Sequence, residues 1–321
     1  MNGIEPPAAP AVSRLIGLAS VLVDVTVAVP SLPPRGGDVI GRSAGTAPGG
    51  GLNALVAASR LGLHAAYAGP HGSGPNGHAV RTALRHDGVA LLTPASEDAD
   101  TGWCLALIEP DGERTFVTVP GAEAVQDGSE LARLALEPGD VVYVSGYDLA
   151  YPRSGPALAR WLDGLTPLSD GGPWLDFDPG PLVAEIPVQS LRIALRRTGL
   201  LTVSDRELAA LVHRVGPAGA PVPDRPGELA GSALVLARGG AQGAVLHWLV
   251  DGQPAMLAAP AAVPPGPVVD TNGAGDAHLG ALLAALHRGQ PWPQALAYAS
   301  RAAAWSLTRP GAATGPTLAD L

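Results

Sequence analysis

The sequence predicts an α/β fold of three layers, in which helices cover both faces of a central, mainly parallel sheet and a small β-sheet forms a lid. Three observations indicate this fold. The second half of the chain alternates strand-like and helical segments, the first half contains hairpin-like segments, and glycine-rich turns follow strands at 49–51, 239–243 and 273–275. Ligands of such sheets bind at the carboxyl ends of the strands. We therefore expect the three turns to converge on one site.

The first half of the chain is expected to supply the lid. Residues 101–121 show the clearest hairpin pattern, because alternating apolar stretches flank Pro-Asp-Gly, a strong turn signal. The other elements expected in this half are a β-rich segment at 15–29, a turn-rich link at 30–41, a glycine turn leading into a helix at 49–63, and a helix at 77–89. We expect one domain over 13–321, with a lid formed by roughly 22–48 and 98–120, after a disordered tail over 1–12.

The second half of the chain is expected to supply most of the parallel sheet. Its elements, in order, are a buried strand at 140–147, a helix near 154–164, a strand at 174–180, a strand, capped turn and helix at 200–216, two strands joined by a glycine turn at 232–249, a helix after 273, and a last helix at 293–309. Strands that alternate with helices are typical of units with parallel strands.

The composition excludes several classes of chemistry. Apolar residues make up 46% and charged residues 15% of the 321 residues, which is enough for a sizeable core. All 20 basic residues are Arg, so a phosphate-binding loop or a Schiff base that needs Lys is excluded. The single Cys104 allows neither an internal disulfide nor a cysteine-based zinc site. The most economical reading of Cys104 is a small buried apolar side chain.

The charge pattern favours an enzyme with small-molecule ligands. The net charge is −9, and no clustered basic face is present, so we expect no nucleic-acid partner. No apolar run reaches the roughly 18–20 residues of a membrane span, and the first residues lack the basic start of a signal peptide. We expect a cytoplasmic protein without a membrane partner.

The segment DTNGAGD, residues 270–276, carries the sharpest chemical signal. The N-terminus of a helix exposes unpaired N–H groups and the positive end of the helix dipole, and small residues let an anion approach that backbone. Gly273, Ala274 and Gly275 therefore predict an anion hole suited to phosphate. Asp276 would then accept a proton from the hydroxyl that attacks this phosphate. An ordinary helix start with Asp in its first turn is the alternative.

Ordered motifs along the chain resemble those of the ribokinase-like (PfkB) carbohydrate kinase family. DTNGAGDAHLGALL resembles the second signature of this family and GGGLNALVAASRLG the first. Further similarities follow the family order in DGERTF (111–116), VVYVSGY, FDPGPL (177–182), SDRE, ARGGAQGA (237–244) and TRPGA (308–312), so that together they cover about residues 15–315. Ordered motifs over nearly the whole chain are far more specific than any single one.

The resemblance implies roles for named residues. Asp276 would be the catalytic base above the Gly273, Ala274 and Gly275 anion hole. The residues implied on the substrate side are Asp24, Gly50, Gly51 and Asn53. The residues implied along ATP and its Mg²⁺ are Ser204, Glu207, Arg238, Gly240 and Gly243, with Glu207 ordering Mg²⁺ through water. The positions that bind a monovalent cation such as K⁺ in some relatives are Asp270, Asn272, Ser306, Arg309 and Gly311.

Several of these residues have a simpler structural reading. Ser204 stands where the family usually has Asn, and with Glu207 three residues later it also matches a capping box. Asp24 and Asn53 could be turn or capping residues. We expect Arg114 to pair with an acid across its own hairpin rather than to contact phosphate, and His278 to be structural.

The function implied is an ATP-dependent kinase that phosphorylates a hydroxyl of a sugar or sugar derivative. A nucleoside kinase of the same fold and a non-catalytic sugar sensor remain alternatives. A dinucleotide-binding oxidoreductase is disfavoured, because GGGLN lacks the spacing of the dinucleotide fingerprint. The exposed strand edges of the lid also offer a surface for a homodimer.

Overall fold

The computed structural model describes residues 6–111, 113–215, 234–311 and 313–321. Its main sheet has nine strands in the order β13-β12-β11-β10-β9-β8-β1-β4-β5. Seven neighbouring strands, from β11 to β5, run parallel, and β12 and β13 are antiparallel at one edge. The bounds of the nine strands are β1 Arg14–Gly17, β4 His64–Tyr67, β5 Ala90–Leu91, β8 Asp140–Ser145, β9 Trp174–Asp178, β10 Thr198–Ser204, β11 Leu234–Arg238, β12 Ala244–Val250 and β13 Gln253–Ala259.

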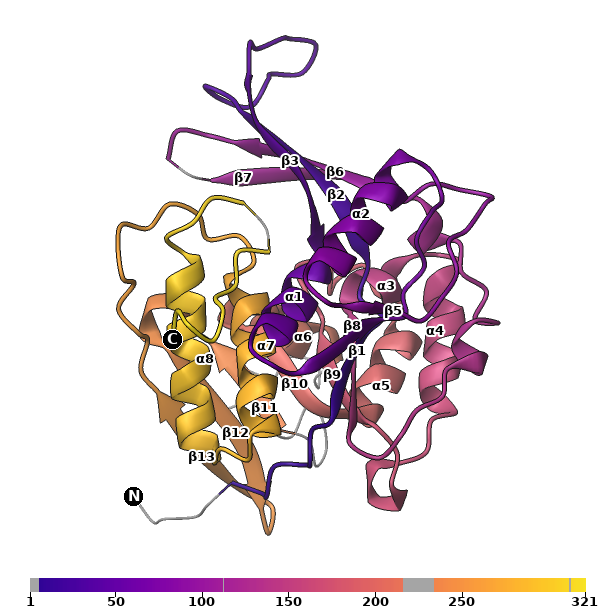
Figure 1. The fold of residues 1–321 in the computed structure, drawn as a ribbon, viewed down its shortest axis with the longest axis vertical. Coiled ribbons are helices and arrows are strands. Elements are labelled where there is room, and N and C mark those ends of the chain that lie inside the picture. Colours follow the sequence, from indigo (N-terminus) through magenta and orange to yellow (C-terminus); the bar gives the residue numbers. More distant parts are fainter. Residues whose placement is uncertain (1–5, 112, 216–233, 312) are drawn as a thin grey trace.

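Helices cover both faces of this sheet, as the alternating pattern predicts (Figure 1). The core on one face contains residues of α1 (Leu52–Arg60), α2 (Pro75–His86), α7 (Ala274–His287) and α8 (Trp292–Ser306). The core on the other face contains residues of α3 (Gly146–Ala150), α4 (Ser154–Asp163), α5 (Val188–Arg197) and α6 (Asp205–Val215). Ten consecutive residues of α7 are buried, which explains why this helix is apolar on every side.

A second sheet of four strands projects from the main body (Figure 1). Its order is β3-β2-β6-β7, with β2 Val21–Ala28, β3 Arg42–Gly50, β6 Trp103–Ile108 and β7 Arg114–Val119. We call this sheet the lid; its strands fall in the two segments for which the sequence predicts it. The register pairs Asp24 with Cys104 and Cys104 with Thr118, so these three side chains share one face.

The structure departs from the expected elements at several places, among them helix α5, Val188–Arg197, which the pattern did not predict. The segment 253–259 forms an edge strand, and residues 146–150 form a short helix, neither of which the pattern predicted. Residues 6–12, expected in a disordered tail, contact the body. Trp292 Nε1 donates to Pro7 O at 2.8 Å, and Val12 is buried. The rest of the expected tail, residues 1–5, lies outside the described residues. Within the described ranges, no helix combines the length and apolarity that crossing a bilayer requires.

Candidate active site

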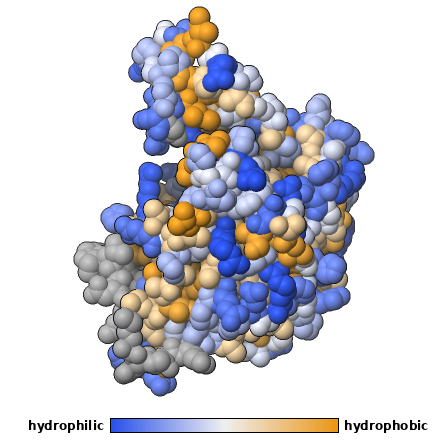
Figure 2. Space-filling model, turned by 60° about the vertical axis from the view of Figure 1, so that its left-hand side comes forward, coloured by the Kyte–Doolittle hydropathy of each residue, from blue (hydrophilic) through white to orange (hydrophobic). Residues whose placement is uncertain are grey.

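A pocket of about 310 Å³ lies between the lid and the strand ends of the main sheet. Figure 2 shows the lid standing over an open cleft. The predicted site residues that line the pocket are Asp24, Gly50, Gly51, Asn53, Glu207, Arg238, Asn272, Gly273, Gly275 and Asp276. The structure thus brings together residues from the lid, from two helix starts and from the strand ends. The other lining residues are Ser20, Leu22, Cys104, Phe116, Thr118, Tyr143, Ser145, Tyr147, Asp178, Gly180 and Pro181.

The start of α7 is built from small residues that border the pocket. Gly273 precedes the helix with φ +72°, a left-handed conformation that suits glycine. Any side chain at Gly275 would overlap the guanidinium of Arg238. Ala274 continues the same turn, and the first N–H groups of a helix have no acceptor within it. Gly273 and Gly275 therefore border the pocket at the positive end of the helix dipole, with no side chain to cover their backbone.

Asp276 lies in the first turn of α7 and is held from two sides. Asn53 Nδ2 donates to Oδ2 at 3.1 Å, and the hydroxyl of Tyr143 donates to Oδ1 at 3.4 Å. Burial raises the pKa of Asp276 to about 6, and the hydrogen bond from Asn53 opposes that shift. A carboxylate with this pKa is ionised at neutral pH and can still accept a proton readily, which suits a general base.

Asn53 makes contacts other than the substrate contact that the resemblance implies. Its Nδ2 donates to Asp276, and its Oδ1 accepts from Ala313 N at 2.8 Å. Both ends of the amide are engaged within the protein, and Asn53 is buried in α1. Asn53 therefore holds the carboxylate of Asp276 in place.

Arg238 lies at the end of β11 beside the anion site. Its Nη2 donates to Asp178 Oδ2 at 2.8 Å, and this contact joins the ends of β11 and β9. Burial raises the pKa of Asp178, while the charge of Arg238 lowers it. The guanidinium adds a fixed positive charge next to the start of α7. The turn after Arg238 contains Gly240 and Gly243, both with positive φ.

Ser204 and Glu207 form the capping box that the sequence allows. Ser204 N donates to Glu207 Oε2 at 2.7 Å, and Glu207 N donates to Ser204 Oγ at 3.3 Å. Glu207 also lines the pocket, near Asp178, whose pKa its charge raises. The cap uses one carboxylate oxygen of Glu207. The donor set therefore fits a water-mediated contact to a phosphate-bound Mg²⁺, because Mg²⁺ keeps several waters and few protein ligands. Among the described residues, no cluster of three His, Cys, Asp or Glu could hold a metal directly.

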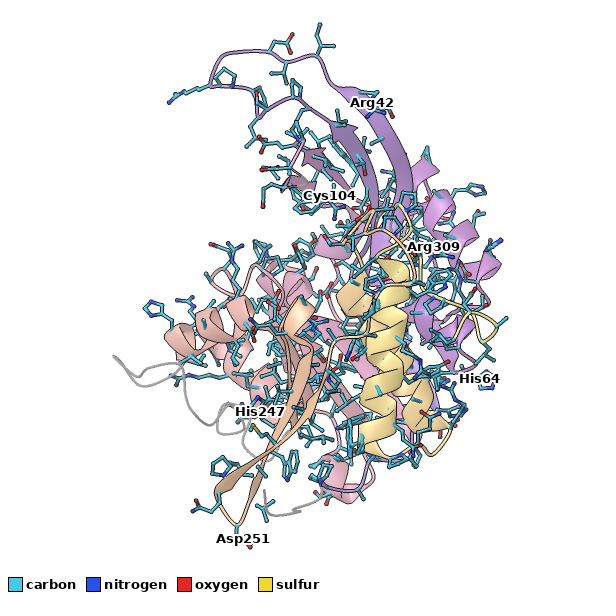
Figure 3. All side chains as sticks on the ribbon, turned by 90° about the vertical axis from the view of Figure 1, so that its left-hand side faces the viewer. Arg42, His64, Cys104, His247, Asp251 and Arg309 are labelled. Atoms are coloured by element: carbon cyan, nitrogen blue, oxygen red, sulfur yellow. The ribbon has the colours of Figure 1, made fainter. Side chains whose placement is uncertain are left out.

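The lid supplies the opposite wall of the pocket. Asp24 is half-buried on β2, and burial raises its pKa to about 6, against the lowering effect of Arg114. Cys104 is buried beside it, with Sγ 3.5 Å from Thr118 Oγ1 (Figure 3). Gly50 and Gly51 close the wall where β3 meets α1. A Cβ at Gly50 would lie 2.5 Å from Ser20 O, so only glycine fits there.

The five residues expected around a monovalent cation are engaged with one another or with their neighbours. Asp270 Oδ1 accepts from Arg114 and from Asn272 N, and Oδ2 accepts from Gly311 N at 3.0 Å. Ser306 Oγ donates to Ala303 O, and the Arg309 guanidinium lies 3.3 Å above the ring of Trp305. The Asp270 carboxylate, the only acidic side chain of this set, is thus paired with a guanidinium, and such a pair leaves no net negative charge there for a K⁺ ion.

The structure shows the surroundings of two residues, Arg114 and His278, whose roles the sequence left open. Arg114 pairs with Asp270, in the loop before α7, and not with an acid of its own hairpin, so that expectation is wrong. His278 is buried, neither of its ring nitrogens has a hydrogen-bond partner among the described residues, and burial lowers its pKa to about 3. A neutral histidine packed in a helix agrees with the structural role expected for it.

Three of the pocket residues that the sequence did not assign to the site make contacts that matter to it. Tyr143 contacts the base, Asp178 pairs with Arg238, and Ser20 lies where β1 leads into the lid. Asp178 belongs to the FDPGPL motif, whose position at a strand end could have drawn attention to it. Tyr143 reads as one more apolar residue of a buried strand, so only the structure finds it.

A base beside a helix start that can hold phosphate is the arrangement of a phosphotransferase that acts on an alcohol group. Comparisons with known proteins agree. The family profile described as pfkB family carbohydrate kinase matches residues 14–318. An uncharacterized sugar kinase of Escherichia coli K12, YegV, is 34% identical over 311 residues, which span 95% of this chain and 91% of that protein. The chain therefore belongs to the pfkB family of carbohydrate kinases.

Solved structures share the fold. Ribokinase of Cryptococcus neoformans var. grubii serotype A, in complex with ADP, has a TM-score of 0.78 at 23% identity, over 96% of this chain and 98% of that one. Burkholderia thailandensis nucleoside kinase, in complex with inosine, has a TM-score of 0.75 at 20% identity, over 95% and 93%. Both neighbours support the three-layer α/β/α architecture with a separate small sheet. The kinase family implies the use of ATP.

Proposed function

We propose that the protein transfers the γ-phosphoryl group of ATP to a hydroxyl of a sugar or sugar derivative. The observation that carries this proposal is the position of Asp276, a buried carboxylate with a pKa near 6, in the first turn of the helix whose start forms the anion site. Asp276 accepts the proton of the attacking hydroxyl. The backbone of Gly273, Ala274 and Gly275 stabilises the negative charge on the transferring group.

ATP is proposed to lie over the strand ends of β10 and β11. Arg238, Gly240 and Gly243 line its path, and the positive φ of both glycines lets the backbone turn close to a ligand. Ser204 and Glu207 begin α6 on the same edge. Glu207 would hold Mg²⁺ through water, and Mg²⁺ would neutralise phosphate charge there.

The acceptor is proposed to bind beneath the lid. A carboxylate accepts two hydroxyl donors at once, so Asp24 suits a polyol, and Gly50 and Gly51 leave room for the sugar ring. Asn53 contributes to this side through Asp276, whose carboxylate it holds with a hydrogen bond. Closure of the lid would exclude water, which otherwise competes with the acceptor hydroxyl for the phosphoryl group.

The rival reading is a nucleoside kinase of the same fold. The similarity to a nucleoside kinase is at 20% identity and concerns the fold alone, whereas the sugar kinase of Escherichia coli is 34% identical. A non-catalytic sugar sensor would not need Asp276 or the anion site, both of which the chain has. These observations favour a sugar kinase.

We also propose a cytoplasmic homodimer joined through its lids. ATP-dependent chemistry and a single cysteine suit the cytoplasm. Apolar residues gather on the lid (Figure 2), and Trp103, Val117 and Val119 are exposed on the face opposite Cys104. A contiguous apolar face of this kind marks an interaction surface.

The test is ADP release from Mg·ATP with a panel of ketoses, aldoses, sugar acids and nucleosides. We expect turnover with a sugar or sugar acid, and Asp276→Asn as the matched control should abolish it. Turnover with nucleosides alone would replace the sugar kinase by its rival. ATP binding without turnover on any acceptor would favour the sensor.

A further inference from the structure

The carboxylate of Asp270 has a complete set of partners from this chain. Arg114 Nη2 and Asn272 N donate to Oδ1, the latter at 2.7 Å, and Gly311 N donates to Oδ2 at 3.0 Å. The side chains of Arg114 and Asp270 are only 17% and 14% exposed. An ion pair with this little solvent around it is screened far less than a surface pair. Asp270 is therefore already neutralised.

The neighbouring oxygens are also engaged. Leu307 O accepts from Val269 N at 2.7 Å and from Asp270 N at 3.1 Å. Ser306 Oγ donates to Ala303 O at 2.7 Å. A bound K⁺ needs several oxygens that face one point in place of its water shell. Here the Asp270 carboxylate, Leu307 O and Ser306 O accept hydrogen bonds from the protein, Ser306 O from Arg309 N at 3.1 Å, and a guanidinium contributes the positive charge.

The position of Arg114 links this corner to the pocket. Arg114 begins lid strand β7, and its charge lowers the pKa of Asp24 across the lid. Asp270 lies three residues before Gly273, where the anion site begins. The positive charge of Arg114 therefore acts at two places, on the loop that leads into the anion site and on Asp24 at the acceptor side of the pocket. Arg is charged at every pH that proteins tolerate, so this charge is permanent.

We propose that Arg114 is a positioning residue that takes the place of a monovalent cation. Its guanidinium neutralises Asp270 and holds residues 270–273 in the conformation that starts the anion site, so turnover needs no K⁺. The proposal rests on the proposed kinase function and goes beyond it, because it concerns the cation requirement of this chain. It also replaces the expectation that Asp270, Asn272, Ser306, Arg309 and Gly311 bind such an ion.

The test compares kcat in K⁺-free buffer, with choline chloride for ionic strength, and in the same buffer with KCl. Wild type should change less than about twofold. Arg114→Ala should lose tenfold or more of its kcat without K⁺ and recover part of it with K⁺, since removal of the side chain opens the corner to an ion. Arg114→Lys keeps the charge and should stay within a few-fold of wild type. Arg42→Ala, on the exposed start of lid strand β3, is the matched control and should behave as wild type (Figure 3).

A second readout does not depend on turnover. The melting temperature of wild type should respond equally to KCl and choline chloride, whereas that of Arg114→Ala should rise specifically with KCl. A wild type that loses tenfold of its kcat without K⁺ would overturn the proposal, as would Arg114→Ala with normal kcat without K⁺. A loss in Arg114→Ala that K⁺ does not relieve would assign Arg114 to lid docking and overturn its charge role. Inactivity of wild type on every acceptor would instead count against the kinase function, and the melting experiment would still test Arg114.

Discussion

The two walls of the pocket are held by different means. The wall to which we assign the phosphoryl group, called the phosphoryl wall below, is a helix start, in which backbone conformation and tight packing fix the N–H donors. Gly280 of α7 lies so close to α1 that a Cβ there would be 2.6 Å from Ala54 O. The wall to which we assign the acceptor, called the acceptor wall below, belongs to the lid, which meets the body where its strands cross over and where Arg114 pairs with Asp270. Function places different demands on them, because one wall must stay fixed while the other must admit a substrate.

Buried carboxylates hold the crossings of the lid. Glu123 accepts from Gly102 N at 3.1 Å and from Gly121 N at 2.6 Å, where β6 begins and β7 ends. Asp148 accepts from Ser20 N at 3.0 Å, where the chain enters β2. Burial raises the pKa of both carboxyl groups, that of Asp148 to about 6. The lid is therefore tied to the body by a few buried hydrogen bonds, whereas the anion site is part of the core.

The largest effect should come from the base between the two walls. Asp276→Asn keeps an oxygen for the hydrogen bond from Asn53 but cannot take a proton at neutral pH. We expect kcat to fall by about 10³-fold, within the usual range for loss of a general base. Steady-state kinetics measures the loss, and calorimetry should find ATP affinity within about twofold of wild type. The control is Asp163→Asn, which removes one partner of the exposed ion pair between Asp163 and Arg196. Turnover close to wild type would remove Asp276 from the role of base.

The next largest effect should come from the phosphoryl wall. A side chain at Gly275 would displace the Arg238 guanidinium and cover the backbone donors. Gly275→Val should therefore reduce kcat by about 10²-fold, which is typical for the loss of one donor to a developing anion. In Gly164→Val, at the end of α4, the nearest atom to the new Cβ is 3.5 Å away, so this control should keep its kcat. A normal kcat in Gly275→Val would contradict the anion site.

The pH dependence should distinguish the two walls. The pKa of Asp276 is raised to about 6, and only the ionised form can accept a proton, so kcat should fall below pH 6, about tenfold by pH 5. The pKa of Asp24 is also raised to about 6, so kcat/KM should fall more steeply than kcat. The profiles are recorded for wild type and for Asp24→Asn, in which the extra slope of kcat/KM should disappear. A kcat that stays level from pH 7 to 5 would show that no group with this pKa acts in the step.

Sequence reasoning found the helix start at residues 273–276 but not the contacts that hold it. Gly273, Ala274, Gly275 and Asp276 are contiguous, so local rules of helix starts suffice. The contacts that hold this segment join distant residues. Asn53 is 223 residues from Asp276 in the sequence, and Arg114 is 156 residues from Asp270. No local pattern encodes such pairs.

Sequence reasoning has the same limit at the edge strand and the N-terminal segment of the fold. Alternating strands and helices predicted the layers, and hairpin-like segments predicted the lid, because period and turn chemistry are local. Strand β13 was missed, since its pairing with β12 and not its own pattern makes it a strand. The contact of Pro7 with Trp292 was missed because proline-rich termini resemble unstructured tails. Tertiary partners decide these cases.

The smallest effect predicted here concerns the acceptor wall. Glu123→Gln keeps the size of the side chain but places an NH₂ group against one of the two N–H donors, Gly102 or Gly121. We expect the free energy of unfolding to fall by about 1–3 kcal/mol, the usual cost of an unsatisfied buried donor. Urea unfolding measures it. The KM for the acceptor should rise several-fold, because the position of the lid changes. The kcat at saturation should change little, because the proposed base and anion site lie outside the crossing that Glu123 holds.

The control for Glu123→Gln is Glu113→Gln, an exposed position in the β6–β7 hairpin, which should match wild type in both measurements. Loss of stability with an unchanged KM would show that Glu123 serves the fold alone and that the lid position does not govern acceptor binding. A fall in kcat equal to the rise in KM would mean that the lid crossing held by Glu123 also sets the geometry of phosphoryl transfer. In that case the two walls act as one body, and the contrast between a fixed and a movable wall fails.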